Sequence, residues 1–485
     1  SPDPYYGAFA RIRCSHLFES KRFKSQFFKS HGEDSLEPIP ATAGVASALS
    51  GSEKSGSEKS GSEKSASGKS LQEGRSLSPS LLPQVVCSTA INPENPEYQA
   101  AIALGCPLFH RSDILAALIQ DYQTIAVAGT HGKTTTSSLI SYMLLKAGVD
   151  PTIIVGGEVN AWEGNARVGS SGYLVAEADE SDGSLVKFSP AIGVLTNIEL
   201  DHPDHYSSLD QVVETFQTFA DRCHTLIGSI DCKTVRDRLK PTITYSLHTD
   251  SGADYTVDQI EYRADGTIAQ VWERENVLGS LKIALLGKHN LSNALAAVAV
   301  GRLLGLEFAA IASAMAPFEG ARRRFEKRGE VNDILFIDDY AHHPSEIQVT
   351  LAAARLHASK TTPPQRVVAI FQPHRYTRTL AFLSEFAASF GDADLVIVSD
   401  IYSAGEPSLD QITGQQVTDL IAHYNPNVHY QPTLQAIAQC LNETLVPGDL
   451  AIFLGAGNLN QVIPDVIAHQ ERIAQKRPTE TVSPL

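Results

Sequence analysis

The sequence predicts an α/β protein of several domains in which most strands are parallel. The chain has 485 residues, which at roughly 150 residues a domain indicates about three domains. Short runs of apolar residues alternate along it with helical segments. Because these runs are continuous and not alternating, they are typical of strands that a parallel sheet buries on both faces. The predicted strands are residues 125–128, 173–176, 191–195, 334–337, 367–371, 395–399 and 450–454.

The first 82 residues differ in composition from the rest of the chain. The pentapeptide Gly51-Ser-Glu-Lys-Ser55 is repeated twice more and then blurs through Ser76. A segment of such low hydrophobicity and alternating charge cannot offset the entropy of ordering, so it is predicted to be a disordered linker. From Val85 onward the chain has the composition of an ordinary α/β protein. Gly320, which precedes three arginines, is predicted to be a domain junction and hinge.

Charge and cysteine usage exclude several classes of protein. The net charge of −16 argues against nucleic acid as the main partner. The six cysteines include no Cys-x-x-Cys pair, so they are predicted to be reduced thiols of a cytosolic protein. The most apolar long stretch, residues 294–317, is interrupted by Arg302 and Glu307, which favours a packed helix pair over a membrane span. No convincing signal peptide is visible, and we expect a cytoplasmic protein without a membrane segment.

A glycine-containing loop follows the first predicted strand and opens into a helix. Its backbone N–H groups and the helix dipole favour a phosphate group. Lys133 is able to reach the outer phosphates, and the Thr134 hydroxyl is able to bind Mg²⁺. The match to the common pattern is incomplete, because the pattern's first glycine would fall at Val127. The loop nevertheless predicts binding of ATP or GTP through Gly129, Thr130, His131, Gly132, Lys133, Thr134 and Thr135.

Acidic residues follow the next two predicted strands. Glu177 is the first acid after residues 173–176 and is predicted to bind Mg²⁺ against the phosphates. The alternative is that the acidic run 177–182 is a solvated loop. His202, one residue after Asp201, is either a second metal ligand or a structural histidine.

Amide and cationic side chains appear on either side of the predicted junction. Asn290 and Asn293 lie three residues apart on one helix face, where their amides are able to pair with a base edge. The alternative is that Asn290 only caps the helix. The arginines at 322–324 are either cations for a phosphate-transfer site or a surface face.

The last third of the sequence contains two dense polar clusters, each directly after a predicted strand. They are residues 338–344 and 371–378. In the second cluster His374, Arg375 and Arg378 indicate recognition of an anionic or carboxylate-bearing group. A lone histidine is usually structural, but two clusters at neighbouring strand ends favour a functional site.

Taken together, seven ordered motifs resemble the Mur ligase family, and in particular its alanine-adding branch. The resemblance covers residues 85–467. The motifs are Gly-Thr-His-Gly-Lys-Thr-Thr at 129–135, Glu-Ala-Asp-Glu-Ser-Asp at 177–182, Asp-His at 201–202, His-Asn-x-x-Asn-Ala at 289–294, Arg-Arg-Phe at 323–325, Asp-Asp-Tyr-Ala-His-His-Pro at 338–344 and Phe-Gln-Pro-His-Arg-Tyr-Thr-Arg at 371–378.

The resemblance implies a domain organisation. We expect a central domain with a P-loop ATPase-type, mostly parallel sheet and a C-terminal Rossmann-like, doubly wound domain that binds the amino acid. The N-terminal Rossmann-like domain, which would bind the UDP-sugar, is expected to be incomplete. The expected ranges are 1–82 for the low-complexity segment, 83–120 for the remnant of the N-terminal domain, 121–319 for the central domain, 320–470 for the C-terminal domain and 471–485 for a tail.

The resemblance also implies roles for individual residues. Those expected to meet ATP and its Mg²⁺ ions are Lys133 at the β- and γ-phosphates, Thr134 and Glu177 at one Mg²⁺, His202 at a second, Asn290 and Asn293 at adenine, and Arg324 and Asp339 from the C-terminal domain. Those expected to position L-alanine and the reacting carboxylate are His374, Arg375 and Arg378, with His343 as a neighbour. No lysine occurs between Lys187 and Lys233, so the carbamylated lysine of several sister ligases is expected to be absent.

The implied reaction is ATP-dependent formation of an amide between the carboxylate of UDP-N-acetylmuramate and L-alanine, through an acyl phosphate, in peptidoglycan precursor synthesis. The sequence departs from the family at one place: between Ser1 and Leu82 it has no Gly-x-Gly-Gly-x-Gly loop for the UDP-sugar. Three interpretations therefore stay open. They are an active alanine-adding ligase, a ligase that attaches a recycled peptide, and a catalytically impaired ATP-binding remnant.

Overall fold

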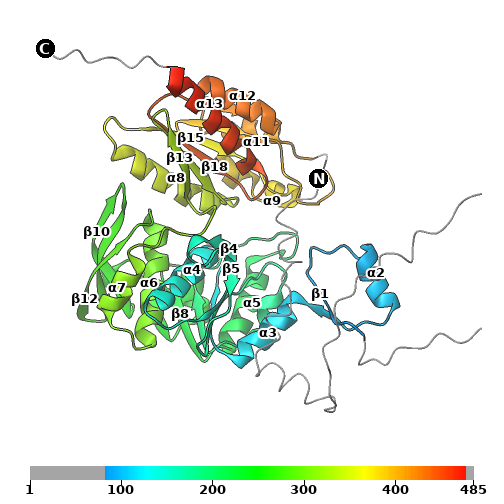
Figure 1. The fold of residues 1–485 in the computed structure, drawn as a ribbon, viewed down its shortest axis with the longest axis vertical. Helices are drawn as coiled ribbons and strands as arrows, with labels where there is room; N and C mark the ends of the chain where they lie inside the picture. Colours follow the sequence, from blue (N-terminus) through cyan, green and yellow to red (C-terminus); the bar gives the residue numbers. More distant parts are fainter. Residues whose placement is uncertain (1–81, 410, 477–485) are drawn as a thin grey trace, which may run out of the picture. The chain divides into compact units, whose positions relative to one another are not determined.

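Two large sheets, one of ten strands and one of six, organise the fold in the computed structural model (Figure 1). The structure describes residues 82–409 and 411–476, so the predicted disordered segment up to residue 81 lies outside the described residues. The chain divides into two compact units between Arg111 and Ser112.

The described part of the first unit is small. Its strands β1 (Val85–Cys87) and β2 (Leu108–His110) pair in parallel and are joined through helix α2 (Pro96–Ala103). The helix begins where it does because the Asn95 side chain accepts hydrogen bonds from the N–H groups of Glu97 and Tyr98, and proline occupies the first helical position.

The ten-stranded sheet belongs to the second unit. Its inner strands, from β4 through β6, β3, β7, β8 and β9 to β10, are parallel, and the pairings at both edges are antiparallel. In spatial order the strands are β12 (Asn276–Ile283), β11 (Gly266–Glu273), β10 (Tyr255–Arg263), β9 (Ile243–Tyr245), β8 (Thr225–Ser229), β7 (Ile192–Leu195), β3 (Gln123–Ala128), β6 (Tyr173–Glu177), β4 (Thr152–Val159) and β5 (Gly164–Arg167).

Strand β3 shows why its sequence is apolar throughout. Ile125 and Val127 contribute to the core that α4, α6 and α7 share, whereas Ala126 and Ala128 contribute to the core beneath α3 and α5. Both faces are therefore covered, as the continuous run predicts. The helices around this sheet are α3 (Arg111–Asp121), α4 (Lys133–Lys146), α5 (Leu209–Asp221), α6 (Lys288–Leu303) and α7 (Phe308–Met315).

The six-stranded sheet is doubly wound. Val367 of β15 faces the core formed with α8, α10 and α11, and its neighbour Val368 faces the core formed with α12 and α13. All pairings are parallel except that of β13 with β14. In spatial order the strands are β13 (Glu326–Val331), β14 (Ile334–Asp339), β18 (Asp449–Leu454), β15 (Arg366–Phe371), β16 (Leu395–Val398) and β17 (Val428–Tyr430).

The remaining helices complete this part of the fold (Figure 1). Those of the six-stranded sheet are α8 (Pro344–Ser359), α9 (Tyr376–Ala381), α10 (Leu383–Ala387), α11 (Gly414–Ile421), α12 (Leu434–Thr444) and α13 (Ile463–Lys476). The short helical turns are η4 (Asn160–Trp162), η5 (Ser184–Lys187), η6 (Val235–Leu239), η7 (Thr249–Ser251) and η8 (Leu459–Val462).

The predicted secondary structure agrees with these elements at all seven strands. The helix pair predicted for residues 294–317 is present as α6 and α7, and no helix among the described residues is long and apolar enough to cross a membrane. The five described cysteines are free thiols. The antiparallel extension β10–β12 was not predicted, and α13 continues past residue 470 to Lys476. The proposed domain boundaries at residues 120, 319 and 470 stay a prediction.

We expect the packing of α6 against the ten-stranded sheet to be a main source of stability. Leu295 is fully buried on α6, whereas Leu303, on the same helix, is 40% exposed. Leu295→Ala should lower the free energy of unfolding by about 2–5 kcal/mol, because it removes buried methyl groups and leaves a cavity. Leu303→Ala should change it by no more than about 0.5 kcal/mol. Urea unfolding of both variants measures the difference, and equal losses would contradict this account of the core.

Candidate active site

The glycine loop connects β3 to α4, and its backbone conformation requires glycine. Gly129 has φ +138° and Gly132 has φ +81°. A Cβ atom at Gly129 would lie 2.0 Å from the Thr196 hydroxyl, so no larger residue fits there. The end of β7 holds the loop, because Asn197 accepts a hydrogen bond from the His131 N–H at 2.8 Å and Thr196 donates one to the His131 carbonyl at 2.6 Å.

Lys133 lies in this loop with its ammonium group held in place. Its Nζ donates to the Gly129 carbonyl at 2.7 Å and to the Glu180 carboxylate at 2.9 Å. Both side chains are largely buried, at 12% and 2% exposure. Burial alone lowers the pKa of Lys133, but Glu180 and Asp179 raise it above its ordinary value. The lysine is therefore charged and oriented in the loop.

Thr134 and Glu177 form a second contact at the loop. The Thr134 hydroxyl donates to Glu177 Oε1 at 2.9 Å, and the Gly156 N–H donates to Glu177 Oε2 at 2.6 Å. Glu177 is the last residue of β6, and Glu180 is 1% exposed. The alternative of a solvated acidic loop is therefore wrong for Glu180, and Glu177 accepts a hydrogen bond at each carboxylate oxygen.

His202 meets the C-terminal polar cluster. Arg378 is 3% exposed; its Nε donates to Asp201 at 2.9 Å and its NH2 lies 3.4 Å from His202 Nδ1. Its NH1 lies 3.3 Å from His374 Nδ1. Burial opposes ionisation of Asp201, yet the Arg378 guanidinium holds the pKa of this carboxyl well below its usual range. His202 Nε2 is in turn 3.9 Å from Glu180, the partner of Lys133. The structure thus brings Lys133, His202, Arg378 and His374 into one continuous network.

Arg375 lies at the margin of this network. Its guanidinium bonds Asp204 at 2.8 Å, and about a third of each side chain is exposed. Its backbone has φ +66°, which turns the chain between β15 and α9. Arg375 is therefore more exposed than Arg378, which is buried.

The two asparagines of α6 lie against the glycine loop. Asn293 Oδ1 is 2.8 Å from the position that a Cβ atom of Gly132 would take. Asn290 donates to the Leu286 carbonyl at 2.8 Å, and Asn293 donates to Asn290 at 3.3 Å. Since Gly287 is the N-cap of this helix, the alternative in which Asn290 caps it is wrong.

Arg324 and Asp339 have partners within the second unit. Asp339 accepts hydrogen bonds from the Phe325 N–H at 2.7 Å and the Ala341 N–H at 2.8 Å, so both carboxylate oxygens bind backbone. Burial raises the pKa of Asp339 to about 6. Arg324 stacks over the Tyr340 ring at 5.1 Å. Of the three arginines only Arg322 fits the surface alternative, because its side chain is 55% exposed.

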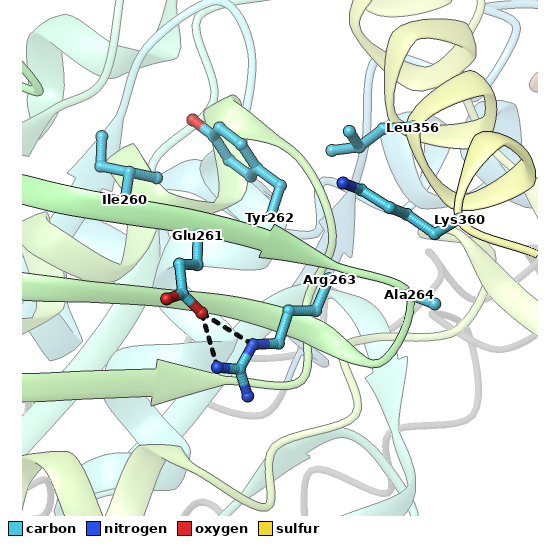
Figure 2. A pocket seen from close by; sticks show the side chains of 7 residues that line it. All are labelled: Ile260, Glu261, Tyr262, Arg263, Ala264, Leu356 and Lys360. Carbon is cyan, nitrogen blue, oxygen red and sulfur yellow. Dashed lines mark hydrogen bonds and ion pairs between the residues drawn. The ribbon is translucent and has the colours of Figure 1, made fainter.

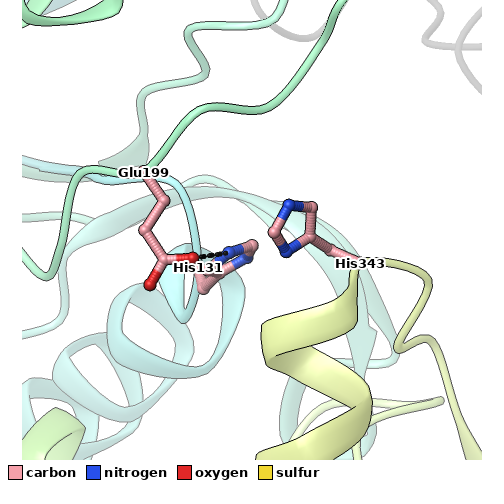
Figure 3. Close-up of side chains that lie close together, drawn as sticks. All are labelled: His131, Glu199 and His343. Atoms are coloured by element: carbon pink, nitrogen blue, oxygen red, sulfur yellow. Dashed lines mark ion pairs between the residues drawn. The ribbon is translucent and has the colours of Figure 1, made fainter. Parts of the chain in front are cut away.

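A further cluster was not predicted as such, although His131 and His343 were singled out separately (Figure 3). His131 Nε2 is 3.3 Å from Glu199, its ring centroid is 4.7 Å from that of His343, and its Nδ1 is 3.3 Å from Glu346. Neither Glu199 nor Glu346 stands in a motif that predicts such contacts. Only its place after β7, at the same strand end as His202, could have indicated Glu199.

A pocket of about 590 Å³ lies apart from these residues, between the end of β10 and α8 (Figure 2). No residue of the predicted site lines it. Glu261 and Arg263 form an ion pair on its β10 side. The residues that line it are Ile260, Glu261, Tyr262, Arg263, Ala264, Leu356 and Lys360.

Comparison with known proteins connects this geometry to one family. The model of the Mur ligase middle domain matches residues 127–301, and that of the Mur ligase glutamate ligase domain matches residues 323–457. The UDP-N-acetylmuramate–L-alanine ligase of Nostoc punctiforme is 73% identical over 388 residues, which cover 80% of each chain. That of a Cyanothece strain is 62% identical over 411 residues, covering 83% of this chain and 84% of the relative.

Solved structures agree with this result. The UDP-N-acetylmuramate–alanine ligase of Thermotoga maritima superposes with a TM-score of 0.69 at 26% identity, covering 81% of this chain and 86% of that one. A second ligase from the same organism, solved with ADP and 18% identical, shares the fold with a TM-score of 0.62. The matched models cover both large sheets, and close relatives match over four fifths of the chain; this protein belongs to the Mur ligase family.

Proposed function

We propose that this chain is an ATP-dependent ligase that joins the carboxylate of UDP-N-acetylmuramate to the amino group of L-alanine through an acyl phosphate, in peptidoglycan precursor synthesis. The observation that carries the proposal is the continuous network from Lys133 in the phosphate loop to Arg378 and His374. The relatives named above, at 62–73% identity, have this activity in their names. Because the reaction consumes ATP, we assign it to the cytoplasm.

The first step brings a carboxylate to a triphosphate, so positive charge must be in place before the two anions meet. Lys133 supplies it on the phosphate side, where its ammonium would exchange the Glu180 carboxylate for phosphate oxygens. Arg378 supplies it on the acceptor side, since it is buried and its orientation is fixed by Asp201. Preorganised charges of this kind need no rearrangement when the transition state forms.

His374 is suited to orient the amino acid. Burial lowers the pKa of His374 to about 2, so its imidazole is neutral at physiological pH. Its Nδ1 faces an Arg378 N–H group and accepts from it, which leaves the proton on Nε2. That Nε2–H group is available as a donor to a carboxylate oxygen of L-alanine or of the sugar.

The residues at the phosphate loop fit a magnesium ion. Thr134 Oγ1 and Glu177 Oε1 are 2.9 Å apart. Neighbouring ligands of an octahedral Mg²⁺ with bonds of about 2.0–2.1 Å lie at about this separation. Ligand atoms of His202, Asp179 and Glu180 lie within 4.8 Å of one another and suit a second cation. When bound, Mg²⁺ would neutralise charge on the transferred phosphoryl group.

A second candidate is the ATP-binding remnant that the sequence leaves open. The two candidates differ in a phosphate-release assay. The ligase should release phosphate only when ATP, UDP-N-acetylmuramate and L-alanine are all present. Binding of ATP without turnover under these conditions would support the remnant. Turnover with a tripeptide in place of L-alanine would instead support the peptide-recycling ligase.

Lys133 and Lys146 stand at opposite ends of α4 and provide a matched pair of variants. Lys133→Ala should lower kcat/KM for ATP by at least ~100-fold, because it removes a preorganised charge from the phosphate site. Lys146 is exposed and lies over the Tyr142 ring, so Lys146→Ala should change kcat/KM less than about twofold. Steady-state kinetics measure both, and a Lys133→Ala enzyme with normal kcat/KM would contradict the assignment.

A further inference from the structure

The His131 side chain lies between two carboxylates, of which Figure 3 shows that of Glu199. Its Nε2 is 3.3 Å from Glu199 Oε2 and its Nδ1 is 3.3 Å from Glu346 Oε1. With 14% exposure the ring is largely shielded from water. Burial lowers the pKa of His131, but the ion-pair contacts with Glu199 and Glu346 raise it to about 10. As an imidazolium, the side chain therefore lies at ion-pair distance from one carboxylate on each side.

The two carboxylates come from different domains. Glu199 follows β7 in the middle domain, and Glu346 lies in the first turn of α8 in the C-terminal domain. A second bond reinforces the contact, since the Ser345 hydroxyl donates to Glu199 Oε2 at 2.7 Å. The phosphate loop is thus joined directly to the N-terminus of α8.

Glu346 is fixed by several other donors. Its Oε2 accepts from the backbone N–H groups of His342 at 3.1 Å and His343 at 3.3 Å, which forms the capping box of α8. Arg324 NH1 lies 3.8 Å from Oε1. Because a buried carboxylate must be paired, loss of the imidazolium would leave Glu346 undercompensated in this position.

The same helix terminus carries the residues that lead to the proposed amino-acid site. The His342 ring packs against the His374 ring at a centroid distance of 5.5 Å, and His374 contacts Arg378. A shift of the α8 N-terminus away from His131 would therefore shift His342 and loosen this packing.

We infer that His131 is a positioning residue whose cationic ring holds the C-terminal domain against the phosphate loop and so keeps His374 and Arg378 in register with bound ATP. The inference rests on the proposed ligase function. It assigns a coupling role to a residue of the phosphate loop whose side chain contacts α8. The cation acts between two protein carboxylates.

A transition-metal site is the competing explanation, because His131, Glu199 and His343 place one ligand atom each within 4.8 Å of one another. The protonation pattern opposes it. His343 Nδ1 accepts a hydrogen bond from the Ser345 N–H at 3.3 Å as the cap of α8, so the proton of the neutral ring resides on Nε2. Metal binding at Nε2 would move that proton to Nδ1 and break the contact that caps α8. A metal ion there would also displace the proton that pairs His131 with Glu199.

The test compares His131→Gln, which removes the charge at similar size, with Glu346→Gln and the double variant. Each single variant should raise KM for L-alanine and lower kcat/KM for L-alanine at least tenfold, while the dissociation constant of a non-hydrolysable ATP analogue changes less than threefold. The loss of kcat/KM for L-alanine in the double variant should be no larger than in the more impaired single variant, because both changes remove the same contact. Glu158→Gln, which removes an exposed ion pair with Arg322, is the matched control and should change neither constant more than twofold.

A second readout separates this inference from the proposed function. In small-angle scattering with the bound analogue, His131→Gln should show a larger radius of gyration than wild type and Glu158→Gln, and this comparison needs no turnover. If wild type releases no phosphate but the difference in radius is present, the proposed function fails and the coupling stands. Equal radii together with an unchanged KM for L-alanine would overturn the coupling. If wild type bound Zn²⁺ stoichiometrically and His131→Gln abolished this binding, the cluster would be a metal site and the coupling would be overturned.

Discussion

The site depends on one constraint: each charge buried at the carboxyl edge of the ten-stranded sheet must have an opposite charge beside it. An unpaired ion there would cost several kcal/mol or lose its charge. Lys133 is paired with Glu180, Arg378 with Asp201, and His131 with Glu199 and Glu346. The cations of Lys133 and Arg378 are therefore held in fixed positions, each beside a carboxylate that a substrate anion or a metal ion could replace or neutralise, whereas His131 stays between two protein carboxylates.

These pairs also explain why two sheets form a single unit. Asp201 and Glu199 extend from the middle domain, while Arg378 and Ser345 extend from the C-terminal domain. Both sets lie at strand ends or helix starts, where loops leave polar groups unpaired within their own domain. The same side chains therefore form both the site and the contact between the domains. A substitution that alters the contact should for this reason also alter the chemistry of the site.

The sequence predicted several helices and strands, but it did not predict which charged side chains pair with one another. Continuous apolar runs located the seven strands because a sheet buried on both faces allows no other pattern, and the glycine loop located Lys133 and Thr134. The antiparallel strands β10–β12 contain no such run. In β10, Val257 is buried while Glu261 is exposed, and this mixture of apolar and charged residues is typical of a loop or an edge strand. Glu180, Glu199 and Glu346 were not identified as partners, since a buried ion pair depends on which loops the fold brings together. Asn290 looked like a helix cap because only the structure places the cap one turn earlier, at Gly287.

The boundary between the two compact units, after Arg111, decides which unit supplies the proposed ATP and amino-acid sites. All residues proposed to hold ATP and the amino acid lie in the unit that begins at Ser112, and their contacts with one another are internal to it. The described part of the first unit offers two three-residue strands and one helix. The proposed phosphate and amino-acid sites are therefore built from residues of the second unit. Binding of the ATP analogue is accordingly the property most directly tied to this architecture, and dependence on UDP-N-acetylmuramate is the one that tells an active ligase from an ATP-binding protein.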